Sequence, residues 1–272
     1  MPSFNEISPQ NLFRLIGTPD APAIIDVRID DDYTLDPRLI PASARRDYHT
    51  ASDWIAGFSG QRVVVSCQKG KKLSHGVAAL MRQFGIDAQS LEGGHLAWVQ
   101  AGLPLVPLDH FTPLPNGSLW VTRHRPKIDR IACPWLIRRF VDPAARFMFV
   151  PPSEVLEVAE KFAATAFDVE GVAFSHINDN CSFDTMLDLF NLKTEALLRL
   201  ATVVRGADTD RLDLAPQAAG LLALSVGLSR MFKDDIAQLA AGMTLYDALY
   251  RWARDGFDES HDWPATRNPA GK

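Results

Sequence analysis

Apolar residues in the first hundred positions follow two patterns, short β-branched runs and helical spacings. Residues 23–27 and 62–66 are short runs rich in isoleucine and valine, which are typical of buried strands. After the second run, apolar residues recur at the i, i+3, i+4, i+7 spacing of an amphipathic helix, at Val77, Leu80, Met81 and Phe84. A strand is expected at 88–91 and a short helix at 95–100. This alternation predicts an α/β domain with a parallel sheet flanked by helices.

The second half of the chain has a different, mostly helical pattern. Strands are expected at 119–122 and 146–150, on either side of a helix near 134–140. From Ser182 onward the apolar spacing predicts helices over residues 182–190, 194–205, 215–232 and 234–254. Gly242 is expected to break the last of these helices. The pattern predicts an α-rich α+β domain.

A proline-rich segment separates the two patterns. Residues 103–118 contain four prolines and no helical period, which is typical of a semi-extended linker. A length of 272 residues also favours two domains. We therefore expect a first domain at 1–107, a linker at 108–118, a second domain at 119–264 and a polar tail at 265–272.

Charge and cysteine content narrow the classes of function. A net charge of −5 argues against broad electrostatic binding to nucleic acid or to an anionic membrane. Three scattered cysteines are too few for a disulfide framework and fit a reducing compartment. No export signal or membrane-spanning run is recognised. We expect a cytoplasmic protein with neither nucleic acid nor membrane as a partner.

The sharpest chemical feature is a cysteine between a strand and a helix. The loop consists of Cys67, Gln68, Lys69, Gly70, Lys71 and Lys72. Backbone N–H groups at a helix N-terminus and nearby lysines favour the thiolate form of Cys67 and attract anions. These properties suit nucleophilic attack by sulfur on an anionic, sulfur-containing donor. The alternative is that Cys67 is a small buried side chain that ends a strand.

Residues 4–107 resemble a single rhodanese domain in three ordered motifs. The motifs are Asp26-Val27-Arg28 followed by Asp32-Tyr33, the loop Cys67-x-x-Gly70-x-Lys72, and Gly93-Gly94 with Trp98 and Gly102-Leu103-Pro104. The resemblance implies a sulfurtransferase in which Cys67 carries a persulfide. Thiosulfate or a persulfide would be the donor, and sulfur transfer would require no cofactor. Asp26 and Arg28 are expected to form a structural pair.

A basic cluster in the second half is a candidate anion site. Arg123, Lys127 and Arg130 lie in a segment that is much more basic than the chain as a whole. Guanidinium groups bind tetrahedral oxyanions well, and chromate or a similar ion would be the ligand. The alternative is a solvated face paired with nearby acids.

A second candidate in this half is a divalent metal site. His176, Cys181 and Asp208 are the proposed ligands, and Asp184 and Asp210 are further acids nearby. The spacing matches no closed zinc pattern. The alternative is that these polar residues cap helices, with Asn180 or Ser182 as an N-cap.

Residues 119–264 resemble the C-terminal domain of the chromate-resistance protein B family. The similar segments are 120–123, 125–140, His176 with 181–184, 205–208 and 245–250. The combined resemblances favour a sulfurtransferase linked to chromate or oxyanion resistance. One alternative is a non-catalytic oxyanion or metal sensor. Another is a metal-dependent enzyme in the second domain that receives sulfur from the first.

Overall fold

The computed structural model describes residues 5–111 and 117–259. Its N-terminal half alternates strands and helices, as the pattern predicts. In chain order the elements are β1 (Glu6–Ile7), α1 (Pro9–Leu15), β2 (Ala23–Asp26), α2 (Asp30–Leu35), β3 (Ser43–Arg45), η1 (Tyr48–Thr50), α3 (Ala51–Trp54), η2 (Ile55–Phe58), β4 (Arg62–Ser66), α4 (Lys72–Gln83), β5 (Asp87–Leu91) and α5 (Gly94–Gln100).

The five strands of this half form one parallel sheet. Their order is β1-β5-β4-β2-β3, and each neighbouring pair is parallel. The carboxyl ends of parallel strands lie at the same edge of a sheet, where ligands commonly bind in open α/β folds. The residues that follow β2, β3 and β4 therefore meet at one edge, and Cys67 directly follows β4.

Alternate residues of the central strands enter two different cores. Ile25, Val63 and Val65 pack on one face with residues of α3 and α4. Ile24 and Val64 pack on the other face, in a cluster that also contains residues of α1, α5 and the C-terminal half. Both faces of the sheet are covered, which explains why these strands are apolar without alternation.

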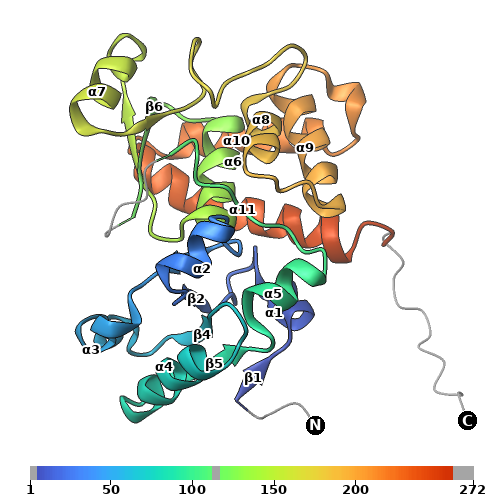
Figure 1. Cartoon of the computed structure of the whole chain (residues 1–272). Coiled ribbons are helices and arrows are strands. Elements are labelled where there is room, and N and C mark those ends of the chain that lie inside the picture. The colour runs from blue at the N-terminus through green and yellow to red at the C-terminus, as the bar shows by residue number, and fades with distance from the viewer. Residues whose placement is uncertain (1–4, 112–116, 260–272) are drawn as a thin grey trace, which may run out of the picture.

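The C-terminal half contains a small parallel sheet and a helical bundle (Figure 1). Strand β6 lies between β7 and β8 and is parallel to both. In chain order the elements are β6 (Leu119–Arg123), α6 (Asp129–Leu136), the π-helical turn η3 (Ile137–Val141), β7 (Arg146–Val150), η4 (Pro152–Glu154), α7 (Val155–Phe162), β8 (Thr165–Ala166), α8 (Ser182–Leu189), α9 (Glu195–Asp208), η5 (Leu212–Leu214), α10 (Ala218–Met231) and α11 (Asp235–Asp255).

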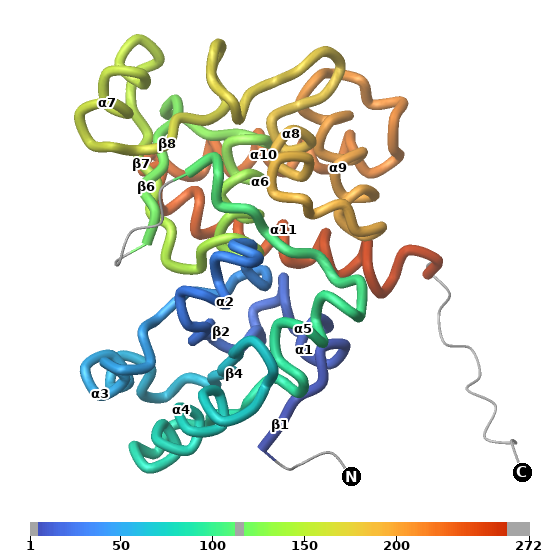
Figure 2. The backbone as a smooth tube through the Cα atoms, in the orientation of Figure 1, coloured from blue at the N-terminus to red at the C-terminus, as the bar shows by residue number. Residues whose placement is uncertain are grey.

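The two halves pack directly against each other. Helix α11 runs along their boundary in Figure 1, and Figure 2 follows the chain from α5 across it into the upper half. The backbone N–H of Ala42 donates to the carbonyl of Phe140 at 2.7 Å. Gly17 has φ +81°, and a Cβ there would lie 2.3 Å from the ring of Phe140. Close contact of the halves therefore requires glycine at this position.

The helices expected after residue 181 are confirmed, but the expected break at Gly242 is wrong. Helix α11 is continuous from Asp235 to Asp255. A Cβ at Gly242 would lie 2.5 Å from Cγ2 of Ile131 in α6, so the glycine allows two helices to approach closely. The domain boundaries stay predictions. Part of the expected linker, 112–116, and the tail at 265–272 lie outside the described residues. In the described ranges, no helix is both long and apolar enough to cross a membrane.

Candidate functional site

Cys67 lies at the carboxyl edge of the N-terminal sheet, between β4 and α4. Its side chain is buried, with the residue 5% exposed. Its sulfur is 3.2 Å from the hydroxyl oxygen of Ser74, which is fully buried in the first turn of α4. The strand thus ends at a thiol that contacts the start of the next helix.

The loop after Cys67 is held in place by the backbone of the segment before α5. The N–H of His95 donates to the carbonyl of Cys67 at 2.9 Å, and the N–H of Leu96 donates to Gln68 at 3.1 Å. Gly70 and Gly94 both have positive φ, and a Cβ on Gly94 would lie 2.1 Å from the Cys67 carbonyl oxygen. Two glycines are therefore needed for the close approach of these backbones.

The surroundings of Cys67 are basic. Lys69, Lys71 and Lys72 are exposed, and in the described part of the chain none of them forms an ion pair within 4 Å. Lys71 is the N-cap of α4, and no side-chain cap hydrogen bond is found there among the described residues. The N–H groups of the first turn therefore stay available to an anion.

Asp26 and Arg28 form the expected structural pair. The Arg28 Nε donates to Asp26 at 2.7 Å, and its other nitrogens donate to the carbonyls of Asp36 and Arg38. Asp36 also lies 3.1 Å from Nε2 of His95, the residue whose N–H holds the Cys67 carbonyl. Burial lowers the pKa of His95 below its usual value, although the hydrogen bond to Asp36 opposes this shift.

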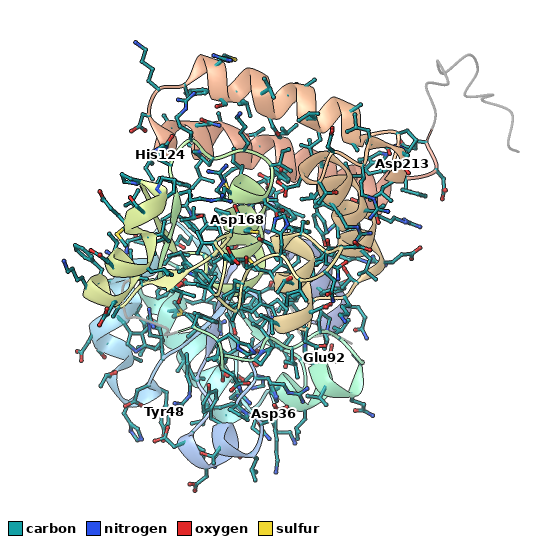
Figure 3. All side chains as sticks on the ribbon, turned by 90° about the horizontal axis from the view of Figure 1, so that it is seen from above. Asp36, Tyr48, Glu92, His124, Asp168 and Asp213 are labelled. Atoms are coloured by element: carbon teal, nitrogen blue, oxygen red, sulfur yellow. The ribbon has the colours of Figure 1, made fainter. Side chains whose placement is uncertain are left out.

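A second cluster of ionisable side chains lies in the C-terminal half. His176 Nε2 is 3.2 Å from Asp208 Oδ2 and 3.4 Å from carboxylate oxygens of both Asp129 and Asp168. Asp129 is the first residue of α6, Asp208 is the last residue of α9, and His176 precedes α8. Figure 3 labels Asp168 well inside this half of the molecule.

The cluster perturbs the titration of its members. Hydrogen bonds to Asp129 and Asp168 raise the pKa of His176 to about 10. Burial and the neighbouring charges of Asp129 and Asp168 raise the pKa of Asp208 to about 7. Burial also raises the pKa of Asp129. Burial alone would also raise the pKa of Asp168, but its hydrogen bonds with His176 and Arg123 hold that pKa below its usual value.

The three predicted anion-binding residues do not form a single site. Arg123 donates to Asp168 at 2.8 Å, and Arg130 lies 3.3 Å from the same carboxylate. Arg130 also lines, together with Lys127, a cleft of about 430 Å³ on the surface of this half. The cleft is lined by His124, Arg125, Lys127, Arg130, Val226, Ser229 and Arg230. Figure 3 shows His124 towards the edge of the molecule.

The three predicted metal ligands are also separated. His176 and Asp208 meet, whereas Cys181 is the N-cap of α8 and its thiol donates to Asp184 at 3.2 Å. The Asp184 carboxylate also accepts the Cys181 N–H at 3.1 Å and pairs with Arg205 at 2.7 Å. Burial raises the pKa of Cys181 well above its usual range. The side chain that comes within 4.8 Å of both His176 and Asp208 is that of Asp129.

Asp129 and Asp168 are the two cluster members that sequence reasoning missed. Asp129 is a single acid at the start of a helix whose remaining residues are almost entirely buried. An acid at the start of such an apolar segment was the sequence signal that could have identified Asp129 as a functional candidate. Asp168 follows β8, a strand of two residues that no sequence pattern predicted.

Comparisons with known proteins find relatives of the C-terminal half. Residues 120–253 match the family model described as ChrB, C-terminal domain. The curated Protein ChrB of Cupriavidus metallidurans is 35% identical over 136 residues, which are 50% of this chain and 40% of that protein. The chain therefore spans less than half the length of this relative.

Solved structures align with the N-terminal part. A rhodanese-like domain protein from Staphylococcus aureus is 26% identical and has a TM-score of 0.32, covering 35% of this chain and 91% of its own. A rhodanese-related protein from Thermoplasma volcanium is 21% identical with a TM-score of 0.33, covering 38% and 98%. A thiosulfate sulfurtransferase from Pseudomonas aeruginosa is 26% identical with a TM-score of 0.32, covering 38% and 19%. The family match thus covers residues 120–253, just under half of the chain.

Proposed function

We propose that the N-terminal half is a sulfurtransferase that carries sulfur on Cys67. The observation that carries this proposal is the position of Cys67 between β4 and the uncapped first turn of α4. The exposed lysines of the loop add positive charge around the thiol. An anionic donor would be attracted to this site, and a thiolate or bound persulfide would be stabilised by the same groups.

The reaction proceeds in two displacement steps. In the first, the Cys67 thiolate attacks the outer sulfur of thiosulfate, so that a sulfur–sulfur bond to Cys67 forms. The original bond breaks and sulfite leaves with the electron pair. In the second, an acceptor such as cyanide or a thiolate attacks the outer sulfur, and the Cys67 thiolate is released. No redox cofactor is needed because each step exchanges one bond to sulfur for another.

Assay of thiosulfate-to-cyanide transfer tests this proposal. We expect turnover by the full chain and a gain of one sulfur atom on Cys67 in the mass spectrum after incubation with thiosulfate alone. Cys67→Ser should lose both signals. Cys181→Ser is the matched control, since serine is a good N-cap and should preserve α8. Equal transfer by wild type and Cys67→Ser would overturn the proposal.

A second candidate function is oxyanion binding by the C-terminal half. It rests on the cleft lined by Lys127, Arg130 and Arg230, because no acidic side chain lines it among the described residues. A tetrahedral divalent anion such as chromate would find several donors there. With the ChrB relationship of this half, we propose that the whole chain serves oxyanion resistance.

Titration calorimetry with chromate and with sulfate tests the second candidate. Wild type should bind, and the double variant Lys127→Gln with Arg230→Gln should bind at least about tenfold more weakly, equivalent to about 1.4 kcal/mol. Lys161→Gln, at the end of α7, is a control for the loss of positive charge. Equal affinity in all three proteins would exclude the cleft as the site.

A further inference from the structure

Two carboxylates and an imidazole from three distant chain segments converge in the C-terminal half. The side chains are those of Asp129, His176 and Asp208, and one ligand atom of each lies within 4.8 Å of the others. Nε2 of His176 is 3.4 Å from Asp129 Oδ2 and 3.2 Å from Asp208 Oδ2. Ligand atoms bound to one ion at about 2.1 Å lie roughly 3.0–3.4 Å from one another, so little movement is needed to surround a cation.

A second observation that points to a bound cation concerns the carboxylate of Asp129. The residue is 1% exposed, and its Oδ2 accepts the N–H of Ser182 at 2.7 Å. Its other oxygen, Oδ1, is buried and has no hydrogen-bond partner among the described residues. Burial of a charged oxygen without a partner costs free energy. A bound cation would supply the missing partner.

The nearby arginines do not neutralise this pair of acids. Arg123 and Arg130 contact Asp168, and Arg205 contacts Asp184. Within the described residues, His176 is the one basic side chain in ion-pair distance of Asp129 or Asp208. Two carboxylates thus face one imidazole. A bound cation would balance the negative charge that the imidazole leaves uncompensated.

We propose that Asp129, His176 and Asp208 bind one divalent transition-metal ion. Carboxylate oxygens with one imidazole nitrogen suit Mn²⁺, Fe²⁺ or Zn²⁺ better than Mg²⁺ or a soft ion. His176 is 42% exposed, so an ion can reach the site from solvent. When the metal binds, Nε2 loses its proton and becomes the ligand atom.

Asp168 is not one of the three proposed ligands, but it contacts one of them, His176, and neighbouring side chains. Its Oδ1 lies 3.4 Å from His176 Nε2 and accepts the Ser182 hydroxyl at 2.9 Å, while its Oδ2 accepts Arg123. Ser182 also donates its N–H to Asp129, so one residue connects both carboxylates. Outer groups of this kind orient ligands and tune the metal.

Metal titration of the untagged full chain tests the proposal. The protein is treated with a chelator, dialysed and titrated separately with MnCl₂, ZnCl₂ and MgCl₂. We expect one equivalent of Mn²⁺ or Zn²⁺ to bind, with Mg²⁺ at least about tenfold weaker. Co²⁺ should give visible absorption bands of a protein-bound ion. Absence of stoichiometric binding by Mn²⁺, Zn²⁺ and Co²⁺ would overturn the proposal.

Variants locate the ion. His176→Ala and Asp208→Asn alter partly exposed side chains, so both should fold, and each should weaken binding at least about tenfold. The controls are His49→Ala and Asp213→Asn, which change exposed residues of the same types elsewhere. Wild-type affinity in His176→Ala would assign the ion to another place. Cys67→Ser should bind metal normally, which separates this proposal from the sulfurtransferase proposal.

Discussion

The sulfur of Cys67 and the hydroxyl oxygen of Ser74 are 3.2 Å apart, and both residues are buried. The same hydroxyl lies 3.1 Å from the carbonyl oxygen of Lys71. A hydroxyl has only one proton, so it can donate either to this carbonyl or to the sulfur. When Cys67 is a thiolate, donation to sulfur gives the stronger, charge-assisted hydrogen bond.

Ser74→Ala should therefore weaken sulfur transfer without unfolding the chain. Loss of one charge-assisted hydrogen bond, worth about 1.5 kcal/mol, predicts a decrease in kcat/KM of roughly tenfold with thiosulfate. Steady-state assay of the variant measures it. Ser59→Ala, at an exposed serine, should match wild type. A Ser74→Ala enzyme with full activity and a normal melting temperature would mean that the hydroxyl does not assist Cys67.

Two glycines, Gly94 beside the Cys67 loop and Gly102 after α5, give a stability prediction. Gly94 and Gly102 both have positive φ, but only at Gly94 would a Cβ meet backbone atoms, whereas Gly102 faces open space. Gly102→Ala should cost about 1 kcal/mol of unfolding free energy from backbone strain alone. Gly94→Ala should cost roughly 1–3 kcal/mol more and reduce transfer activity. Urea unfolding of both variants measures the difference, and equal losses would show that the loop can move away from Gly94.

Two helical glycines should respond to alanine in opposite directions. At Gly242 in α11 the new methyl group would overlap Ile131, while at Gly227 in α10 nothing lies within 4 Å of it. Gly242→Ala should lower the unfolding free energy by about 1–3 kcal/mol through overpacking. Gly227→Ala should raise it by up to about 1 kcal/mol, because alanine is the better helix former. Thermal melts with both variants test this, and stabilisation by Gly242→Ala would contradict the close packing of α6 and α11.

Local features were predictable from sequence, and features assembled from distant segments were not. The Cys67 loop was recognised because its strand, cysteine, glycine and helix are contiguous. Cys181 was proposed as a metal ligand with helix capping as the alternative, and in the fold Cys181 and Asp184 form the capping hydrogen bonds at the start of α8. Asp129 joins His176 only through the packing of α6 beside α8, so the apolar sequence around Asp129 marks it as unusual but does not identify His176 as its partner.

The role of Gly242 was misread for a related reason. Glycine lowers intrinsic helix propensity, and sequence alone gives no view of a neighbouring helix. In the fold, the missing side chain admits Ile131, and burial of that contact outweighs the local cost. The burial of the N-terminal sheet was easier to anticipate. Strands β2 and β4 are apolar on both faces, so both faces of the sheet must be covered.

Buried His95 should make stability depend on pH. The ring is 2% exposed and contacts Asp36, with Arg28 and Asp26 also acting on it. Burial lowers the pKa of His95 in the folded state, so the unfolded chain binds a proton more readily at this residue. Its contribution to stability is full above the unfolded pKa, near 6.5, and is lost as the pH falls below that value towards the folded pKa.

His95→Gln should remove this dependence, because glutamine does not titrate. Urea unfolding at pH 7.5 and pH 5.5, conditions chosen about one unit either side of the unfolded histidine pKa, should show wild type losing more stability on acidification than His95→Gln. The comparison uses the difference between the two proteins, since the raised pKa of His176 gives a slope of opposite sign in both. His49→Gln, at an exposed histidine, is the control and should follow wild type. If His95→Gln and wild type lose the same free energy between these pH values, then His95 takes up its proton as readily in the folded chain as in the unfolded one.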